Sequence, residues 1–175
     1  ADLARLGTGQ LAALSATQIS SLSTAQVAAL STDQIQGLGA KQIAALTSEQ
    51  VNLGLSTAQI QALTTGQVKA LTTAQVAALS TAQIAAMETA DLAALSAQQI
   101  KGFGSDQIAA LTTDQASALT ASQIKNLSTD QIAALETADL ARLGTAQLAA
   151  LSATQIRSLS TAQVAALSTD QIQGL

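Results

Sequence analysis

The chain has 175 residues, a net charge of −4, a single aromatic side chain, and no cysteine, histidine or proline. Without cysteine and histidine it lacks disulfides, thiolate metal ligands and the side chain that most often acts as acid or base at neutral pH. Seven basic residues against eleven acidic ones argue against a nucleic-acid partner. Ser, Thr and Gln interrupt every apolar run well before the roughly 20 residues that a membrane-spanning helix needs, so we expect no membrane insertion.

One eight-residue pattern, here called the octad, is repeated from Leu6 to the last residue and is well represented by residues 71–78, LTTAQVAA. We number its slots from the leucine. Slot 1 is Leu except at Met87 and Phe103, and slot 6 is aliphatic except at Ala116. Slots 2 and 3 hold mainly Ser or Thr, slot 5 holds Gln, and slots 7 and 8 are small. About 21 octads therefore form a single repeat array over residues 1–175.

The octad predicts a short helix rather than a segment of one long helix. Eight residues turn about 800° along an α-helix, so an apolar stripe of this period drifts by about 80° per octad. A helix start is also written into each octad, because Ser or Thr at slot 2 followed by Gln at slot 5 is the capping-box pattern. In two octads Glu88 and Glu136 occupy slot 2, and Asp91 and Asp139 occupy slot 5. There we expect the cap to shift by one residue.

Charged residues support helices about one octad long. All eleven acids lie in slots 2, 4 or 5, and six of the seven basic residues lie in slots 7 or 8, as a helix dipole of that length favours. A helix of about six or seven residues is not stable alone, so slots 1 and 6 must pack against other octads. The sequence therefore predicts an all-α solenoid of very short N-capped helices. A β-solenoid is the alternative, which the Thr, Ile and Val content allows.

Slots 7 and 8 suggest a larger unit of two octads. Ala-Ala pairs alternate with bulkier or polar pairs near both ends of the chain, whereas residues 61–126 keep this alternation poorly. We therefore expect 16-residue units of two helices stacked in two layers. The slot-7 residues Ala28, Ala44 and Ala165 should then be more buried than their counterparts in the alternate octads, Ser20, Gln36 and Arg157.

Two further features interrupt or extend the pattern. One octad has nine residues, with the insertion near Gly54, and we expect a wider turn there; a binding notch is the alternative. Residues 138–175 duplicate residues 1–38 with two differences, Gly9 against Ala146 and Ser20 against Arg157. A duplication of this length suits a protein selected for length.

No catalytic, cofactor-binding or metal-ligating residues are identifiable, and no cofactor is expected. The acids are scattered and lack the glycine and aspartate spacing of calcium loops, so we expect no enzyme and no metal site. The glutamines of slot 5 could form a stacked amide ladder, although helix capping already explains them. Ser and Thr of slots 2 and 3 could form a regular face that binds a glycan, a protein or ice, which is the alternative function.

The tandem pattern Leu-Ser/Thr-Thr-x-Gln-Ile/Val-x-Ala resembles repeat tracts in very large bacterial surface or secreted proteins, including adhesin-like ones. The resemblance implies an extended spacer, stalk or filament-forming rod within a larger extracellular or cell-surface protein. The first residues show no signal-peptide pattern. Since both ends have the same octad pattern as the interior, we expect both to expose aliphatic residues of slots 1 and 6 and to associate end to end.

Overall fold

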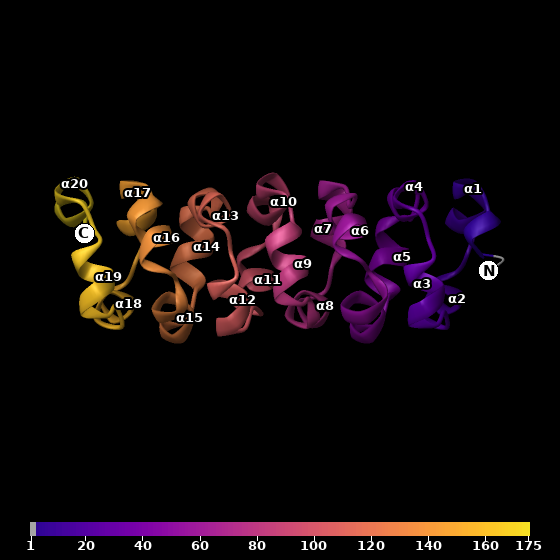
Figure 1. Cartoon of the computed structure of the whole chain (residues 1–175), viewed down its shortest axis with the longest axis horizontal. Helices are drawn as coiled ribbons and strands as arrows, with labels where there is room; N and C mark the ends of the chain where they lie inside the picture. The colour runs from indigo at the N-terminus through magenta and orange to yellow at the C-terminus, as the bar shows by residue number, and fades with distance from the viewer. Residues whose placement is uncertain (1–2) are drawn as a thin grey trace.

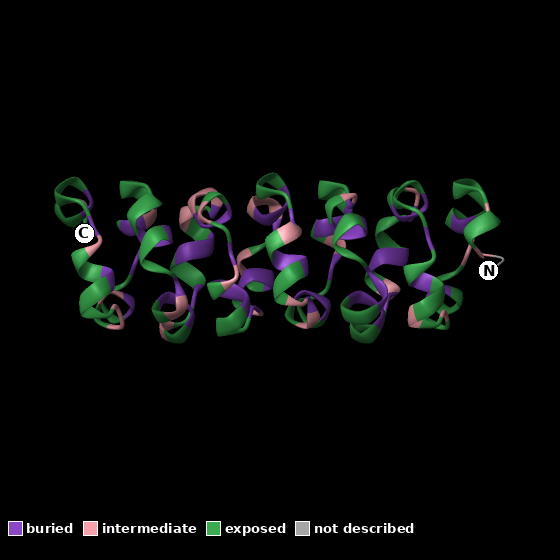
Figure 2. Cartoon of the chain, in the orientation of Figure 1, coloured by how far each residue is buried: buried purple, intermediate pink, exposed green. Residues whose placement is uncertain are grey.

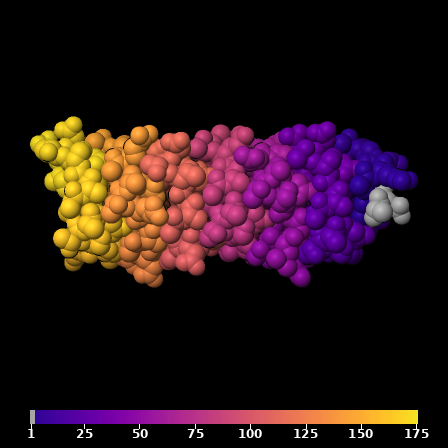
Figure 3. All heavy atoms as spheres, in the orientation of Figure 1, coloured from indigo at the N-terminus to yellow at the C-terminus, as the bar shows by residue number. Residues whose placement is uncertain are grey.

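The computed structural model describes residues 3–175, which form a straight row of short helices with no β-strand among them. The helices follow one another from one end of a rod to the other, and the N- and C-terminal ends lie at opposite ends of the rod (Figure 1). In the space-filling view the chain colours succeed one another along the same axis (Figure 3). The protein is therefore an α-solenoid, as the octads predict, and not a β-solenoid.

Each octad contributes one helix, and most helices have five or six residues, slightly fewer than the sequence predicts. Two or three residues link most of them. The elements are η1 Leu3–Arg5, α1 Thr8–Ala12, α2 Ala16–Ser20, α3 Thr24–Ala28, α4 Thr32–Gln36, α5 Ala40–Ala45, η2 Gln50–Gly54, α6 Thr57–Gln61, α7 Thr65–Ala70, α8 Thr73–Ala78, α9 Thr81–Ala86, α10 Thr89–Ala94, α11 Ala97–Lys101, α12 Ser105–Ala109, α13 Thr113–Ala118, α14 Ala121–Asn126, α15 Thr129–Ala134, α16 Thr137–Arg142, α17 Thr145–Leu148, α18 Ala153–Arg157, α19 Thr161–Ala165 and α20 Thr169–Gln173.

The predicted capping boxes are confirmed. Before α15, the Ser128 Oγ accepts the N–H of Gln131 at 3.1 Å, and the Gln131 Oε1 accepts the N–H of Ser128 at 2.7 Å. Where slot 2 is glycine the second bond alone forms, as from the Gly104 N–H to Gln107 Oε1 at 2.8 Å. The caps therefore set where each helix starts.

The predicted shift of the cap in the two acidic octads is wrong. Glu88 and Glu136 keep the extended N-cap conformation without any side-chain capping bond, and the helices still begin at slot 3. The buried residues of slots 1 and 6 keep both octads in the common register without a capping side chain; they are Met87 and Leu92 in one octad and Leu135 and Leu140 in the other.

The helices wind with between three and four octads per superhelical turn. The helix pairs in extensive contact are three octads apart, such as α13 with α16 and α11 with α14. Hydrogen bonds from side chains reach three and four octads back, as from Gln75 to Leu46 and Ile43. Each helix therefore packs across two helices of the preceding turn. The predicted two-layer stack of 16-residue pairs is wrong, because it would require extensive contacts between helices two octads apart.

The burial pattern contradicts the 16-residue unit as well. Slot 7 points outward in both sets of alternate octads. The six slot-7 residues that the unit predicts to differ in burial are all exposed: Ala28, Ala44, Ala165, Ser20, Gln36 and Arg157. Slot 8 faces slot 3 of the preceding turn, where a carbon added to Gly37 would come within 2.9 Å of the Thr8 Cβ. Space in slot 8, rather than a two-octad unit, explains its small residues.

The core is one continuous apolar column along the rod axis. Slot 6 is fully buried in every octad from Leu11 to Leu148, and slot 1 is almost fully buried from Leu30 to Leu151. Met87 and Phe103 are core residues at 3% and 4% exposure, as their leucine slots predict. Buried residues line the inner side of the helices, while the outer sides are exposed (Figure 2). No described helix is long and apolar enough to cross a membrane.

The extra residue of the nine-residue octad is absorbed inside a helix and not in a wider turn. Gln50–Gly54 form a π-helical turn, in which the Leu55 N–H donates to the Gln50 carbonyl five residues back at 3.1 Å. Leu53 is pushed outward and is 68% exposed. Gly54 is buried, and a carbon added to it would lie 3.1 Å from the Val27 side chain. The predicted wider turn is therefore wrong, because the bulge keeps both neighbouring octads in register.

Candidate functional site

The slot-5 glutamines form a continuous set of hydrogen bonds between turns, which we call the glutamine ladder. From Gln34 onward each amide has two roles. Its Oε1 caps its own helix, and in most octads its Nε2 donates to the slot-6 carbonyl four octads back and to the slot-1 carbonyl three octads back. In α13, Gln115 Nε2 donates to Ile84 at 2.8 Å and to Met87 at 2.6 Å. The ladder joins each turn to the preceding one.

The ladder explains why slot 5 is glutamine and not glutamate. A capping box accepts either residue, but only the amide carries N–H groups. From Gln34 onward nearly all ladder glutamines are buried, with Gln75, Gln83 and Gln115 at 2% exposure. Capping was predicted correctly, whereas the second role of the amide was missed: the Nε2 groups donate to backbone carbonyls and not to one another. The recurrence of glutamine alone, without glutamate, was the signal in the sequence.

Two rungs of the ladder are acidic. Asp91 and Asp139 occupy the amide positions of α10 and α16 at 3% and 1% exposure. A carboxylate has no N–H to offer the slot-6 and slot-1 carbonyls of the preceding turn, which are Ile60 and Leu63 for Asp91, and Ile108 and Leu111 for Asp139. Instead the Thr65 hydroxyl donates to Asp91 Oδ1 at 2.7 Å. The Oδ2 of Asp139 is buried without a hydrogen-bond partner among the described residues.

Burial raises the pKa of Asp139 above its ordinary value of 3.8. The nearby Glu136 carboxylate raises the pKa further, while hydrogen bonds from the Thr113 hydroxyl and the Glu136 backbone lower it. Residues 3–175 contain no cluster of three or more acidic side chains that could hold a metal ion. Because their carboxylates donate no hydrogen bond to the preceding turn, Asp91 and Asp139 are weak points of the ladder.

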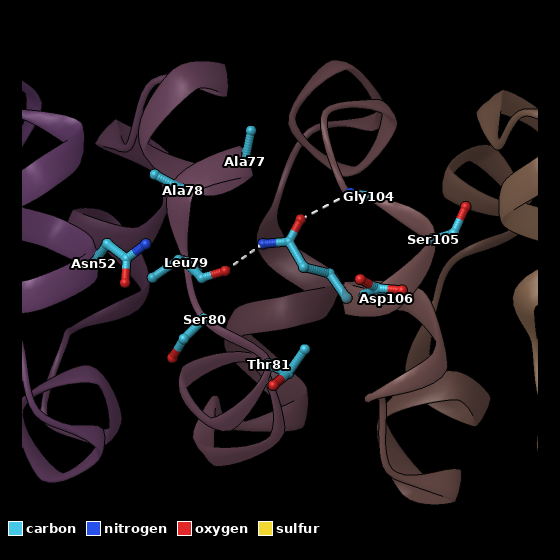
Figure 4. A pocket seen from close by; sticks show the side chains of 10 residues that line it. Asn52, Ala77, Ala78, Leu79, Ser80, Thr81, Gly104, Ser105 and Asp106 are labelled. Atoms are coloured by element: carbon cyan, nitrogen blue, oxygen red, sulfur yellow. Dashed lines mark hydrogen bonds between the residues drawn. The ribbon is translucent and has the colours of Figure 1, made fainter.

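A shallow groove of about 480 Å³ crosses three adjacent turns beside the π-helical turn (Figure 4). The ladder bonds of Gln107, to the Gly104 N–H and the Leu79 carbonyl, lie in it. Besides Gln107, polar side chains of five residues line its walls: Asn52, Ser80, Thr81, Ser105 and Asp106. They supply hydrogen-bond donors and acceptors to a polar ligand, and they include no pairing of a nucleophile with a base.

The two end faces of the rod differ. At the N-terminal face the first three ladder glutamines, Gln10, Gln18 and Gln26, are exposed, while slot 6 is already fully buried. At the C-terminal face the slot-6 residues Val164 and Ile172 are 42% and 45% exposed. The prediction that both ends expose slots 1 and 6 holds for the C-terminal face. At the N-terminal face only slot 1 is partly exposed, because the following turn covers slot 6.

The fold and the ladder define this protein as an α-solenoid built from tandem octads. The sequence profile of the ALTTAQ repeat matches residues 1–32, 28–53, 53–81, 84–121 and 140–175. The chain therefore belongs to the ALTTAQ repeat family. No curated protein matches the chain.

Proposed function

We propose that the chain is a non-catalytic structural segment, which acts as an extended spacer, stalk or filament-forming rod of a larger extracellular protein. The observation that carries this proposal is the strict axial order of the packing. Extensive helix contacts reach three octads along the chain, and the ladder reaches four. Each added octad therefore lengthens the rod and leaves its width unchanged.

Small-angle scattering on arrays of different length tests the rod. Chains with half and twice the number of octads should have maximum dimensions proportional to octad number at a constant cross-sectional radius. A globular scaling of dimension with length would contradict the proposal. Protease digestion of intact cells that carry the tagged parent protein tests the extracellular location, and full protection of the tag would contradict it.

The groove supports a second candidate function, a binding module for polyhydroxyl ligands such as glycans. Its five polar residues include three hydroxyl side chains, and exposed hydroxyls of slot 3 continue along the rod. Binding to a glycan array that is abolished by Asp106→Ala with Ser105→Ala would support it. A matched variant away from the groove, Asp130→Ala with Thr129→Ala, serves as the control and should bind as the unchanged protein does.

A further inference from the structure

We propose that Asp139 completes its rung of the glutamine ladder as a neutral carboxylic acid, whose O–H donates to a backbone carbonyl of the preceding turn. Loss of this proton loosens the contact between α13 and α16, so the rod contains a pH-sensitive joint at this rung. The inference concerns the interior of the rod and holds whatever covers its ends. It follows from the burial of Asp139, from the acceptors that face its slot and from the charges around it.

The side chain of Asp139 is enclosed by the rod. It is 1% exposed, and its Oδ2 is buried without a hydrogen-bond partner among the described residues. The hydrogen bonds that the carboxyl does accept come from the Thr113 hydroxyl and from the backbone of Glu136. An unpaired charged oxygen is costly in such a place, whereas a protonated oxygen becomes a hydrogen-bond donor. Burial therefore favours the acid form of Asp139.

Two backbone carbonyls without a side-chain donor face this slot. In the neighbouring octads the slot-5 amide donates to carbonyls 31 and 28 residues back, as from Gln131 to Phe103 at 2.7 Å. The same spacing assigns Ile108 and Leu111 to Asp139. No side chain in the described part of the chain donates to either carbonyl. A carboxylate only repels these oxygens, while a carboxylic acid offers them one donor.

The packing of α16 on α13 suits the shorter side chain. A carboxyl of aspartate lies one methylene closer to the backbone than the amide of glutamine does. The pair α13 and α16 is in more extensive contact than any other helix pair among residues 3–175. The hydroxyl of Thr113, in the first turn of α13, reaches the carboxyl of Asp139. The rod therefore closes around Asp139 and brings its carboxyl toward the carbonyls of the preceding turn.

The charged groups around Asp139 oppose its ionisation or are already paired. Burial raises the pKa of Asp139 most, and the Glu136 carboxylate on the same helix raises it further. Arg142, also on α16, pairs with Asp114 of α13 at 3.8 Å, and both side chains are largely exposed. Asp106 on α12 adds only negative charge, and α19, which also packs on α16, has no charged residue. These four described helices therefore present no free cation to the buried carboxyl.

Ionisation changes the balance at this rung. The proton passes to solvent, and the carboxylate stays buried against two carbonyl oxygens, which is unfavourable. Opening of the contact between α13 and α16 admits water to the carboxylate and so becomes easier. Because the folded-state pKa is raised, the closed joint is fully stabilised below the ordinary value of 3.8 and loses that stabilisation as the pH rises through the folded-state pKa.

Hydrogen exchange along a pH series tests the joint. After correction for the intrinsic exchange rate, the backbone amides of α13 and α16 should lose protection as the pH rises from about 4 to about 9. The loss should be about tenfold for each unit by which the pKa of Asp139 is raised. The amides of α8, where the Gln75 rung does not titrate, should keep their protection. Protection in α13 and α16 that is constant or grows with pH would overturn the proposal.

A neutral variant and a matched control assign the effect to one residue. Asp139→Asn supplies an uncharged side chain of the same size with its own N–H donors, so protection should be high throughout the pH series. Asp130→Asn removes an exposed acid of α15 and should keep the pH dependence of the unchanged protein. A pH dependence that survives in Asp139→Asn would overturn the proposal. Restoration of protection by CaCl2 at neutral pH would also overturn it, because a cation and not a proton would then join the carboxyl to the carbonyls.

The carboxyl carbon signal of Asp139 in NMR spectra gives a second readout. In the unchanged protein the midpoint of its titration should lie above 3.8. Glu136→Gln removes the like charge and should lower the midpoint, while Thr113→Val removes a donor to the carboxylate and should raise it. A merely structural role of Asp139 would not move the midpoint in opposite directions in these two variants. A midpoint at or below 3.8 in the unchanged protein would overturn the proposal.

Discussion

The rungs at Gln115 and Asp139 occupy the same slot in helices that contact each other, α13 and α16, yet they connect differently to the preceding turn. The amide of Gln115 caps its helix and donates to the carbonyls of Ile84 and Met87. The carboxyl of Asp139 has no N–H and leaves its Oδ2 without a partner. The comparison shows that an octad keeps its place without the bonds from an amide to the carbonyls of the preceding turn.

The largest expected effect comes from removing a complete rung. Gln115→Ala leaves two carbonyls and the Thr112 N–H without their partner, so we expect a loss of about 3 kcal/mol in the free energy of unfolding. Gln18→Ala is the matched control, because Gln18 is exposed and only caps its helix; it should cost about 1 kcal/mol. Equal losses in denaturant melts would show that the bonds between turns contribute nothing.

Replacing the acid of an acidic rung by glutamine should raise the free energy of unfolding. Asp139→Gln replaces a buried carboxyl by the amide of the other rungs, so we expect a gain of about 2 kcal/mol at neutral pH. Asp91→Gln is the comparison and should gain less, because each acid accepts a threonine hydroxyl but only Asp139 has a buried side-chain oxygen without a partner among the described residues. Urea melts of the two variants measure both values. A loss of stability in Asp139→Gln would contradict the interpretation of this rung as a weak point.

The gain from Asp139→Gln should depend on pH. The folded-state pKa of Asp139 is raised, so the folded state holds its proton more tightly than the unfolded state does. The contribution of Asp139 to stability is then fully present below the ordinary value of 3.8 and is lost as the pH rises through the folded-state pKa. The advantage of the glutamine variant should therefore be largest at neutral pH and shrink on acidification. Urea melts of both proteins from neutral pH down to the ordinary pKa of 3.8 measure this difference in stability. A difference that grows on acidification would exclude a raised pKa.

The smallest effects are expected at caps and surface charges. The Ser160 Oγ accepts the Gln163 N–H at 3.2 Å, so Ser160→Ala should cost about 1 kcal/mol. Lys69 is exposed in slot 7, and Lys69→Ala should stay within about 0.5 kcal/mol of the unchanged protein. Thermal melts compare the two. Equal effects would indicate that the hydroxyl caps contribute no more than an exposed charge.

Local features of the fold were predictable from the sequence, since they depend on neighbours within one octad. Ser128 and Gln131 identify a capping box by spacing alone, and the acids and bases mark the two ends of each helix. The superhelix was not predictable in the same way. The angle between successive helices decides whether Thr8 meets Gly37 or a residue of a nearer octad, and an eight-residue period carries no information on that angle.

The ladder lay between these two cases. Its capping bonds follow from the spacing of residues within one octad. Its bonds between turns could not be predicted without knowing which distant octads are neighbours in space. The 16-residue unit was predicted wrongly from slots 7 and 8 because residues 1–38 are duplicated. An alternation that is copied with the duplicated block resembles a structural period. The π-helical turn at Gln50–Gly54 was visible only as an inserted residue, and nothing local distinguishes a bulge from a longer link.

Among residues 3–175 there is no cis peptide bond and no residue with positive φ. The links between helices therefore need no glycine for its backbone conformation. Glycine is needed only where an added side chain would meet a neighbouring helix, as at Gly37. Replication slippage that adds or deletes a whole repeat in the gene then produces a chain that still folds, shorter or longer by one helix. We expect such a gene to vary readily in repeat number, so that natural variation adjusts the reach of the protein without altering its cross-section.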